Sequence, residues 1–83
     1  MGIAMDSAKI TPIGKISSPA DLGQLVRELR QKQGATQVDL ANFAQTGQRF
    51  IVELEAGKPT VRLDKVLQVL NILGVDLLAA RRT

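Results

Sequence analysis

The side chains that most often carry out catalysis are nearly absent from this chain of 83 residues. Histidine and cysteine do not occur, so the commonest general base, the commonest metal ligand and any disulfide framework are missing. Glu53 and Glu55 are close in sequence, but residues two positions apart on a helix point in different directions and do not act on one substrate together. No serine lies in a nucleophile motif. We therefore expect that the protein is not an enzyme and uses no metal, cofactor or small-molecule substrate.

The charged residues indicate a surface that suits a polyanion. Eleven Lys and Arg against eight Asp and Glu give a net charge of +3, a mild excess that fits nucleic acid without requiring it. Phe43 and Phe50 are the only aromatic residues, so a platform that stacks single-stranded bases is not expected. No apolar run approaches the ~18 residues of a membrane span, and residues 1–6 lack the features of a secretory signal. We expect a cytosolic protein with no membrane association.

Capping residues, glycines and prolines divide the chain into short helices. Ser18, Pro19 and Asp21 predict the first helix start, and Thr36 and Asp39 predict the second. Apolar residues at helical spacing then place the helices at about 19–33, 37–44, 48–56 and 60–73. We expect an all-α domain of four or five helices over residues 18–74, after a flexible arm at 1–17. The remaining residues, 75–83, fit a dimerisation tail that forms either an edge strand or one more helical turn.

Residues 36–58 have the spacing of two short helices joined by a tight turn. Ala41 is small where the two backbones must approach, and Ile51, ten positions later, is a branched apolar residue that fills the angle between them. Leu40 and Leu54 would anchor the pair to the first helix. In a helix-turn-helix of this kind, the second helix enters the major groove of DNA.

At these residues the sequence resembles the XRE-type, or phage-repressor-type, helix-turn-helix regulators. The resemblance covers roughly residues 20–75 and rests on Thr36, Gln37, Leu40, Ala41, Ile51, Leu54, Glu55, Gly57 and Lys58, followed by Leu73, Gly74 and Val75. Ser18-Pro19 and residues 60–70 are further similar to HipB-type antitoxins, small dimeric repressors that also bind a HipA-like serine/threonine kinase toxin.

The resemblance implies a phage-repressor-like fold and a sequence-specific transcriptional repressor of double-stranded operator DNA. It further implies the antitoxin of a type II toxin–antitoxin system, which autoregulates its operon in the bacterial cytoplasm and lies on the nucleoid when bound to its operator. The alternatives are a stand-alone XRE-family regulator and a protein-interaction module that has lost DNA binding.

By the same resemblance, the base-reading residues belong to the third helix and are Gln48, Arg49, Phe50 and Glu53. Arginine can hold guanine through two hydrogen bonds, glutamine can hold adenine, an apolar ring edge can contact a thymine methyl, and glutamate can accept from cytosine. Alternatively, Phe50 packs against the first helix, and Glu53 orients Arg49, four residues earlier. The expected phosphate contacts are Gln37, Thr46, Gly47, Lys58, Arg62 and Lys65; the alternative is that these residues contact only water.

The apolar residues near the C-terminus exceed what one small core needs. We expect a homodimer, because small repressors pair to match two half-sites about one DNA turn apart. The expected interface is Val69, Ile72, Leu73, Val75, Leu77 and Leu78; the alternative is that these residues complete the core of a single chain. The predicted core of the single chain is Leu22, Leu25, Leu29, Leu40, Ile51, Leu54, Val66, Leu67 and Leu70.

Three residues depart from the pattern of the family. Gln45 stands where the family usually has glycine, so a left-handed backbone there would be strained; the alternative is that Gly47, two residues later, moves the turn. Phe43 stands where a solvated polar residue is usual, and it either contacts the toxin or turns inward over the first helix. Glu53 places an acid on the helix that is expected to face phosphates.

Overall fold

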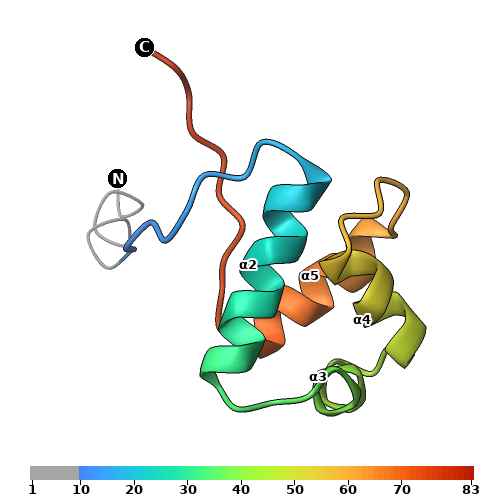
Figure 1. Cartoon of the computed structure of the whole chain (residues 1–83). Helices are drawn as coiled ribbons and strands as arrows, with labels where there is room; N and C mark the ends of the chain where they lie inside the picture. Colours follow the sequence, from blue (N-terminus) through green and yellow to red (C-terminus); the bar gives the residue numbers. More distant parts are fainter. Residues whose placement is uncertain (1–9) are drawn as a thin grey trace.

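The computed structural model describes residues 10–83, and four helices occupy most of that range (Figure 1). They are α2 (Pro19–Lys32), α3 (Gln37–Ala44), α4 (Gln48–Glu55) and α5 (Leu63–Ile72). No strand occurs within residues 10–83, and the predicted all-α fold is confirmed for this part of the chain. The arm predicted at 1–17 has neither helix nor strand at 10–17, and its residues 1–9 lie outside the described residues. The tail from residue 75 onward forms neither of the two structures considered for it.

The first two helices begin at the caps that the sequence predicts. The Ser18 hydroxyl accepts a hydrogen bond from the Asp21 amide at 3.1 Å, which satisfies one of the amides that the first turn leaves free. The Thr36 hydroxyl accepts from the Asp39 amide at 3.0 Å, and the Asp39 carboxylate accepts from the Thr36 amide at 2.9 Å. This reciprocal capping box fixes the start of α3.

The turn between α3 and α4 contains the strained residue that the sequence predicts. Gln45 has φ 58° and ψ 43°, and it is the one residue other than glycine with positive φ among those described. An L-residue in this left-handed region costs roughly 1–2 kcal/mol. The backbone is nevertheless bonded there, since the Thr46 amide donates to the Ala41 carbonyl at 2.9 Å.

The core lies between the four helices, where α4 packs against α2 and α3 and where α5 packs against α3. Its most deeply buried large side chains are Leu40, Ile51, Leu54, Leu70, Val26, Val66 and Val69. The predicted core is confirmed for Leu40, Ile51, Leu54, Val66 and Leu70, whereas Leu22, Leu25 and Leu29 are only half-buried. The prediction was wrong for Leu67, which is 44% exposed, because it lies toward the outer side of α5.

Two residues predicted for the dimer interface belong to this core instead. Val69 is completely buried and Leu73 is 7% exposed, both within a single chain. Val69 follows Val66 by three residues and precedes Leu73 by four, so all three share the inner face of α5. The assignment of Val69 to an interface is therefore wrong, and Leu73 has little surface left to offer a second chain.

A glycine lets α2 approach the end of α4 closely. A methyl group on Gly23 would overlap the Leu54 carbonyl oxygen and lie 2.7 Å from the Glu55 carbonyl oxygen. These are backbone atoms, which cannot move aside as a flexible side chain could. Gly23 therefore sets how closely α2 and α4 can pack.

Candidate nucleic-acid interface

The beginning of α4 presents the most open polar surface of the helix-turn-helix. Gln48 and Arg49 are both exposed, and the Arg49 side chain keeps 90% of its accessible surface. Gly47 caps the helix without any side-chain hydrogen bond. The Phe50 amide donates to the Gly47 carbonyl at 3.1 Å; the amides before it have no partner within the helix, so this end offers N–H donors and a partial positive charge to an anion. Gln48 and Arg49 are thus exposed at a helix end that suits an anion.

Glu53 forms ion pairs with two cations of this surface, Lys58 and Arg49. Its Oε2 atom accepts a hydrogen bond from Lys58 Nζ at 3.1 Å and lies 3.5 Å from Arg49 Nε. The Lys58 hydrogen bond holds the pKa of Glu53 below its usual value; partial burial opposes this shift, and Arg49 adds to it. The pairing of Arg49 with Glu53, one of the two alternatives for this residue, is present in the structure.

Phe50 turns toward the protein rather than outward. Its ring is half-buried against the core, and Lys65 Nζ of α5 lies 5.8 Å from the ring centroid. A cation over a ring face at this distance is attracted by the ring electrons. Phe50 therefore packs inward on the core, with Lys65 beside it at the first turn of α4.

A buried ion pair connects this surface to the rest of the fold. Arg30 of α2 donates to the Glu55 carboxylate from Nε at 2.6 Å and from Nη2 at 2.9 Å, and the two side chains are only 11% and 4% exposed. Arg30 also donates to the Ala35 carbonyl, at 2.9 Å. Gln37, at the start of α3, donates to the same carboxylate at 3.2 Å. One carboxylate thus links α2, α3 and α4, and it orients the amide of Gln37, a predicted phosphate contact.

The remaining predicted phosphate contacts differ in their exposure and in the hydrogen bonds that they already make. Arg62 is exposed but makes two hydrogen bonds to Asp64, at 2.6 and 3.1 Å. Gly47 is exposed at the start of α4. The prediction that the Thr46 amide binds phosphate was wrong, because that amide is already donated to the Ala41 carbonyl.

The surfaces predicted for protein partners are exposed as well. Phe43 on α3 is 66% exposed and does not turn inward over α2. Of the predicted dimer residues, Ile72, Leu77 and Leu78 are 42%, 54% and 59% exposed, and Val75 is half-buried.

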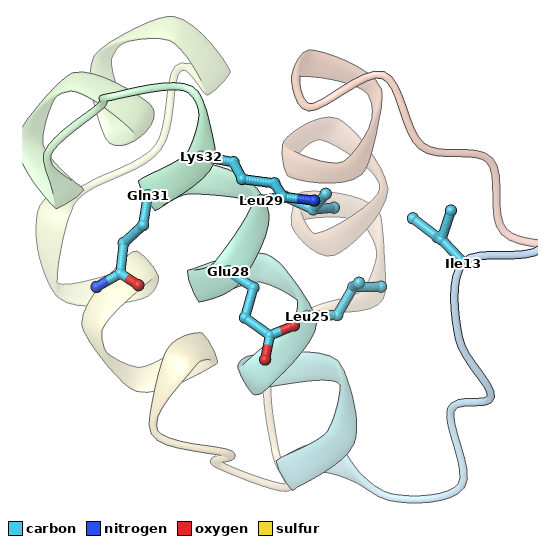
Figure 2. A pocket seen from close by; sticks show the side chains of 6 residues that line it. All are labelled: Ile13, Leu25, Glu28, Leu29, Gln31 and Lys32. Carbon is cyan, nitrogen blue, oxygen red and sulfur yellow. The ribbon is translucent and has the colours of Figure 1, made fainter.

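A shallow apolar groove lies on another side of the molecule, beside α2 (Figure 2). Figure 2 shows Leu25 and Leu29 pointing from α2 toward Ile13 of the N-terminal segment, with Glu28 and Lys32 along the same helix. None of the residues assigned to DNA or to the dimer lines this groove.

Two helices joined by a tight turn, with Gln48 and Arg49 exposed at the start of the second helix, define a helix-turn-helix DNA-binding domain. The sequence profile of the family described as "Helix-turn-helix domain" matches residues 21–82. The chain belongs to this family and is a transcriptional regulator of the XRE type, similar to HipB. Among the described residues, no helix is long and apolar enough to cross a membrane.

A curated relative and two solved structures support this assignment. The HTH-type transcriptional regulator y4mF of Sinorhizobium fredii is 55% identical over 67 residues, which are 78% of this chain and 88% of the relative. The structure described as a HipB-O4 20mer complex matches with a TM-score of 0.77 and 25% identity, covering 86% of this chain and 100% of the other. The structure of a HipA-HipB-O2-O3 complex matches with the same TM-score, identity and coverage.

Proposed function

We propose that this regulator is a dimeric repressor that reads its operator with the first turn of α4. The observation that carries the proposal is the exposure of Gln48 and Arg49 at a helix start that no side chain caps. Arg49 has the donors to hold a guanine, and Gln48 can pair with an adenine. Glu53 either accepts from a cytosine amino group or orients Arg49, and its contact with Arg49 favours orientation.

Phosphate contacts on both sides of α4 would fix the orientation of this helix on the duplex. Lys58 follows the C-terminal end of α4, and Lys65 lies beside Phe50 in its first turn. Gln37, Gly47 and Arg62 would extend the contacts along the backbone. Such contacts supply affinity and register, whereas the base edges supply specificity.

The direct test is binding to the DNA upstream of the gene itself, measured by fluorescence anisotropy across a range of salt concentrations. Replacing Arg49 with alanine should cost about 1–3 kcal/mol on the operator and relax the preference at one base position. Arg27→Ala is the matched control, because Arg27 is an exposed arginine of α2 outside the interface. Unchanged affinity and sequence preference in Arg49→Ala would refute the assignment of α4 as the recognition helix.

The dimer would form through the exposed apolar residues of the α5 end and the tail. A tail that pairs with its copy would bury Leu77 and Leu78, which are more than half exposed in the single chain. Replacing both with aspartate should give a folded monomer in sedimentation equilibrium, with much weaker binding to a two-half-site operator. A variant that remains dimeric would show that the chains associate elsewhere.

The antitoxin role rests on the similarity to HipB, whose solved complexes include one with HipA. We propose that the partner is a HipA-like serine/threonine kinase encoded next to this gene, and that Phe43 contacts it. The purified neighbouring kinase should bind the regulator in calorimetry, and Phe43→Ser should weaken that binding without changing operator affinity. If no such kinase is encoded there or none binds, the chain is a stand-alone regulator, the description that suits the name of its relative from S. fredii.

A further inference from the structure

Glu53 is an acid in the middle of the proposed recognition helix, and one of its oxygens serves two cations. Oε2 accepts from Lys58 Nζ at 3.1 Å and lies 3.5 Å from Arg49 Nε. Lys58 and Arg49 keep 44% and 90% of their side-chain surface, so neither is held by burial. Without Glu53, both cations would be free to contact phosphate.

The internal pairing competes directly with DNA of arbitrary sequence. Non-specific affinity depends mainly on how many phosphates the protein neutralises. Lys58 keeps two of its three ammonium donors while it is bonded to Glu53, but the carboxylate neutralises its charge and repels the approaching DNA backbone, so Lys58 gains less from a phosphate than an unpaired lysine would. The usual pKa of a glutamate, 4.5, is already below neutral pH and the Lys58 hydrogen bond lowers that of Glu53 further, so this negative charge is present at neutral pH.

An operator site differs because it offers Arg49 acceptors on a base edge. Glu53 approaches Nε of Arg49, which leaves the two terminal nitrogens of the guanidinium available for O6 and N7 of a guanine. Arg49 can therefore read a base while it keeps its contact with Glu53. The same terminal nitrogens can also reach a phosphate, but there the negative charge of Glu53 beside them opposes the approach of the DNA backbone.

We propose that Glu53 is a specificity-determining residue, which withholds Lys58 and Arg49 from the phosphates of non-operator DNA while it orients Arg49 for a base. This inference rests on the proposed DNA-binding function and adds to it the means by which other sequences are disfavoured. The acid that departs from the pattern of the family thereby has a role in discrimination.

The test compares the DNA affinity of the unmodified protein, the parent, with that of the Glu53→Gln variant. Binding is measured on two labelled duplexes of roughly 30 bp, which are long enough for two half-sites. One duplex has mixed sequence and the other comes from upstream of the gene. On the mixed duplex we expect binding about five- to tenfold tighter at about 0.1 M salt, because one added phosphate contact changes the slope of log K against log salt by about −0.9. On the upstream duplex the gain should be smaller or absent, so that the ratio of the two affinities falls.

Two further variants separate restraint of the cations from a general effect of charge. Glu28→Gln makes the same change in net charge on α2, outside the interface, and should leave the mixed-duplex affinity close to that of the parent. In a Lys58→Gln background, most of the gain from Glu53→Gln should disappear, because the restrained cation is already gone. Circular dichroism of each variant confirms that the helices remain.

Several results would overturn the inference. One is an equal gain in mixed-duplex affinity for Glu28→Gln, and another is a gain from Glu53→Gln that persists fully in the Lys58→Gln background. The others are a salt slope for Glu53→Gln that equals that of the unmodified protein, and an unchanged ratio of the affinities for the two duplexes. Absence of binding to the mixed duplex by both parent and Glu53→Gln at low salt would also overturn it. A parent that does not prefer the upstream duplex would instead count against the proposed function, and a steeper slope for Glu53→Gln on the mixed duplex would then still support the restraint of Lys58.

Discussion

Removing Glu55 should destabilise the domain far more than removing a comparable ion pair at the surface. In Glu55→Leu, the Arg30 guanidinium remains buried, with the Ala35 carbonyl as its remaining partner. Breaking a buried pair by removing one partner costs about 3–5 kcal/mol. A domain of 83 residues has a total stability of about 4–12 kcal/mol. The loss is therefore a large share of the whole, and it corresponds to a fall in melting temperature of roughly 15–30 °C.

The assay is urea unfolding followed by far-UV circular dichroism at one fixed protein concentration, because association would make stability depend on concentration. Arg62→Met is the matched control. Arg62 also makes two hydrogen bonds to a carboxylate, but its side chain and that of Asp64 are 68% and 60% exposed. An exposed pair of this kind contributes little, so the urea midpoint should hardly move.

A double variant keeps the experiment informative if Glu55→Leu does not fold. Arg30→Met together with Glu55→Leu replaces both charges by apolar side chains, which is often nearly neutral for a buried pair. We expect the double variant to recover most of the lost stability. A loss below about 1 kcal/mol in Glu55→Leu, or a double variant no more stable than the single one, would refute the reasoning from burial.

Three further predictions concern the backbone and the helix caps. Gly23→Ala should destabilise by more than about 3 kcal/mol in urea unfolding, since its methyl group would overlap backbone oxygens of α4, while Gly14→Ala, with open space around it, should be nearly neutral. Gln45→Gly should raise the free energy of unfolding by up to about 1 kcal/mol, because relief of the left-handed strain exceeds the added chain entropy; a lower urea midpoint would contradict this. The hydrogen bond from the Thr36 amide lowers the pKa of Asp39 from its usual 3.8, so its contribution to stability is complete above that value and is lost as the pH falls through the lower pKa of the folded state. Asp39→Asn should therefore show a smaller loss of stability between neutral and acidic pH, measured as the urea midpoint at each pH.

Local chemistry explains why the helix boundaries could be predicted from the sequence. Ser18 and Thr36 cap the helices that follow them, and each effect needs only residues three positions away. Gly57, with φ 82°, ends the segment after α4 in the same local manner. The left-handed conformation of Gln45 was also predictable, because the turn requires it whatever residue stands there.

Features that depend on distant parts of the chain could not be predicted in this way. Arg30 looks like a solvated cation at the end of a helix, yet it follows Val26 by four residues and so shares the inner face of α2. Its partner, Glu55, is 25 positions away. Similarly, the pattern of α5 did not show which apolar residues face inward, so Val69 and Leu67 were each assigned to the wrong side.

The exposure of Gln48 and Arg49 has a consequence for how such a regulator diversifies. Neither residue contributes to the buried core, so new side chains at these two positions should have little effect on folding. Under the proposed function, they would alter which bases are preferred. Gly23, Arg30 and Glu55 have no such freedom, since a change at any of them disturbs the packing of α2 on α4. Under the proposed function, operator preference can therefore change between duplicated copies of the gene while the packing of the helices is preserved. The same separation makes the first turn of α4 the natural place to build a library of variants with altered specificity.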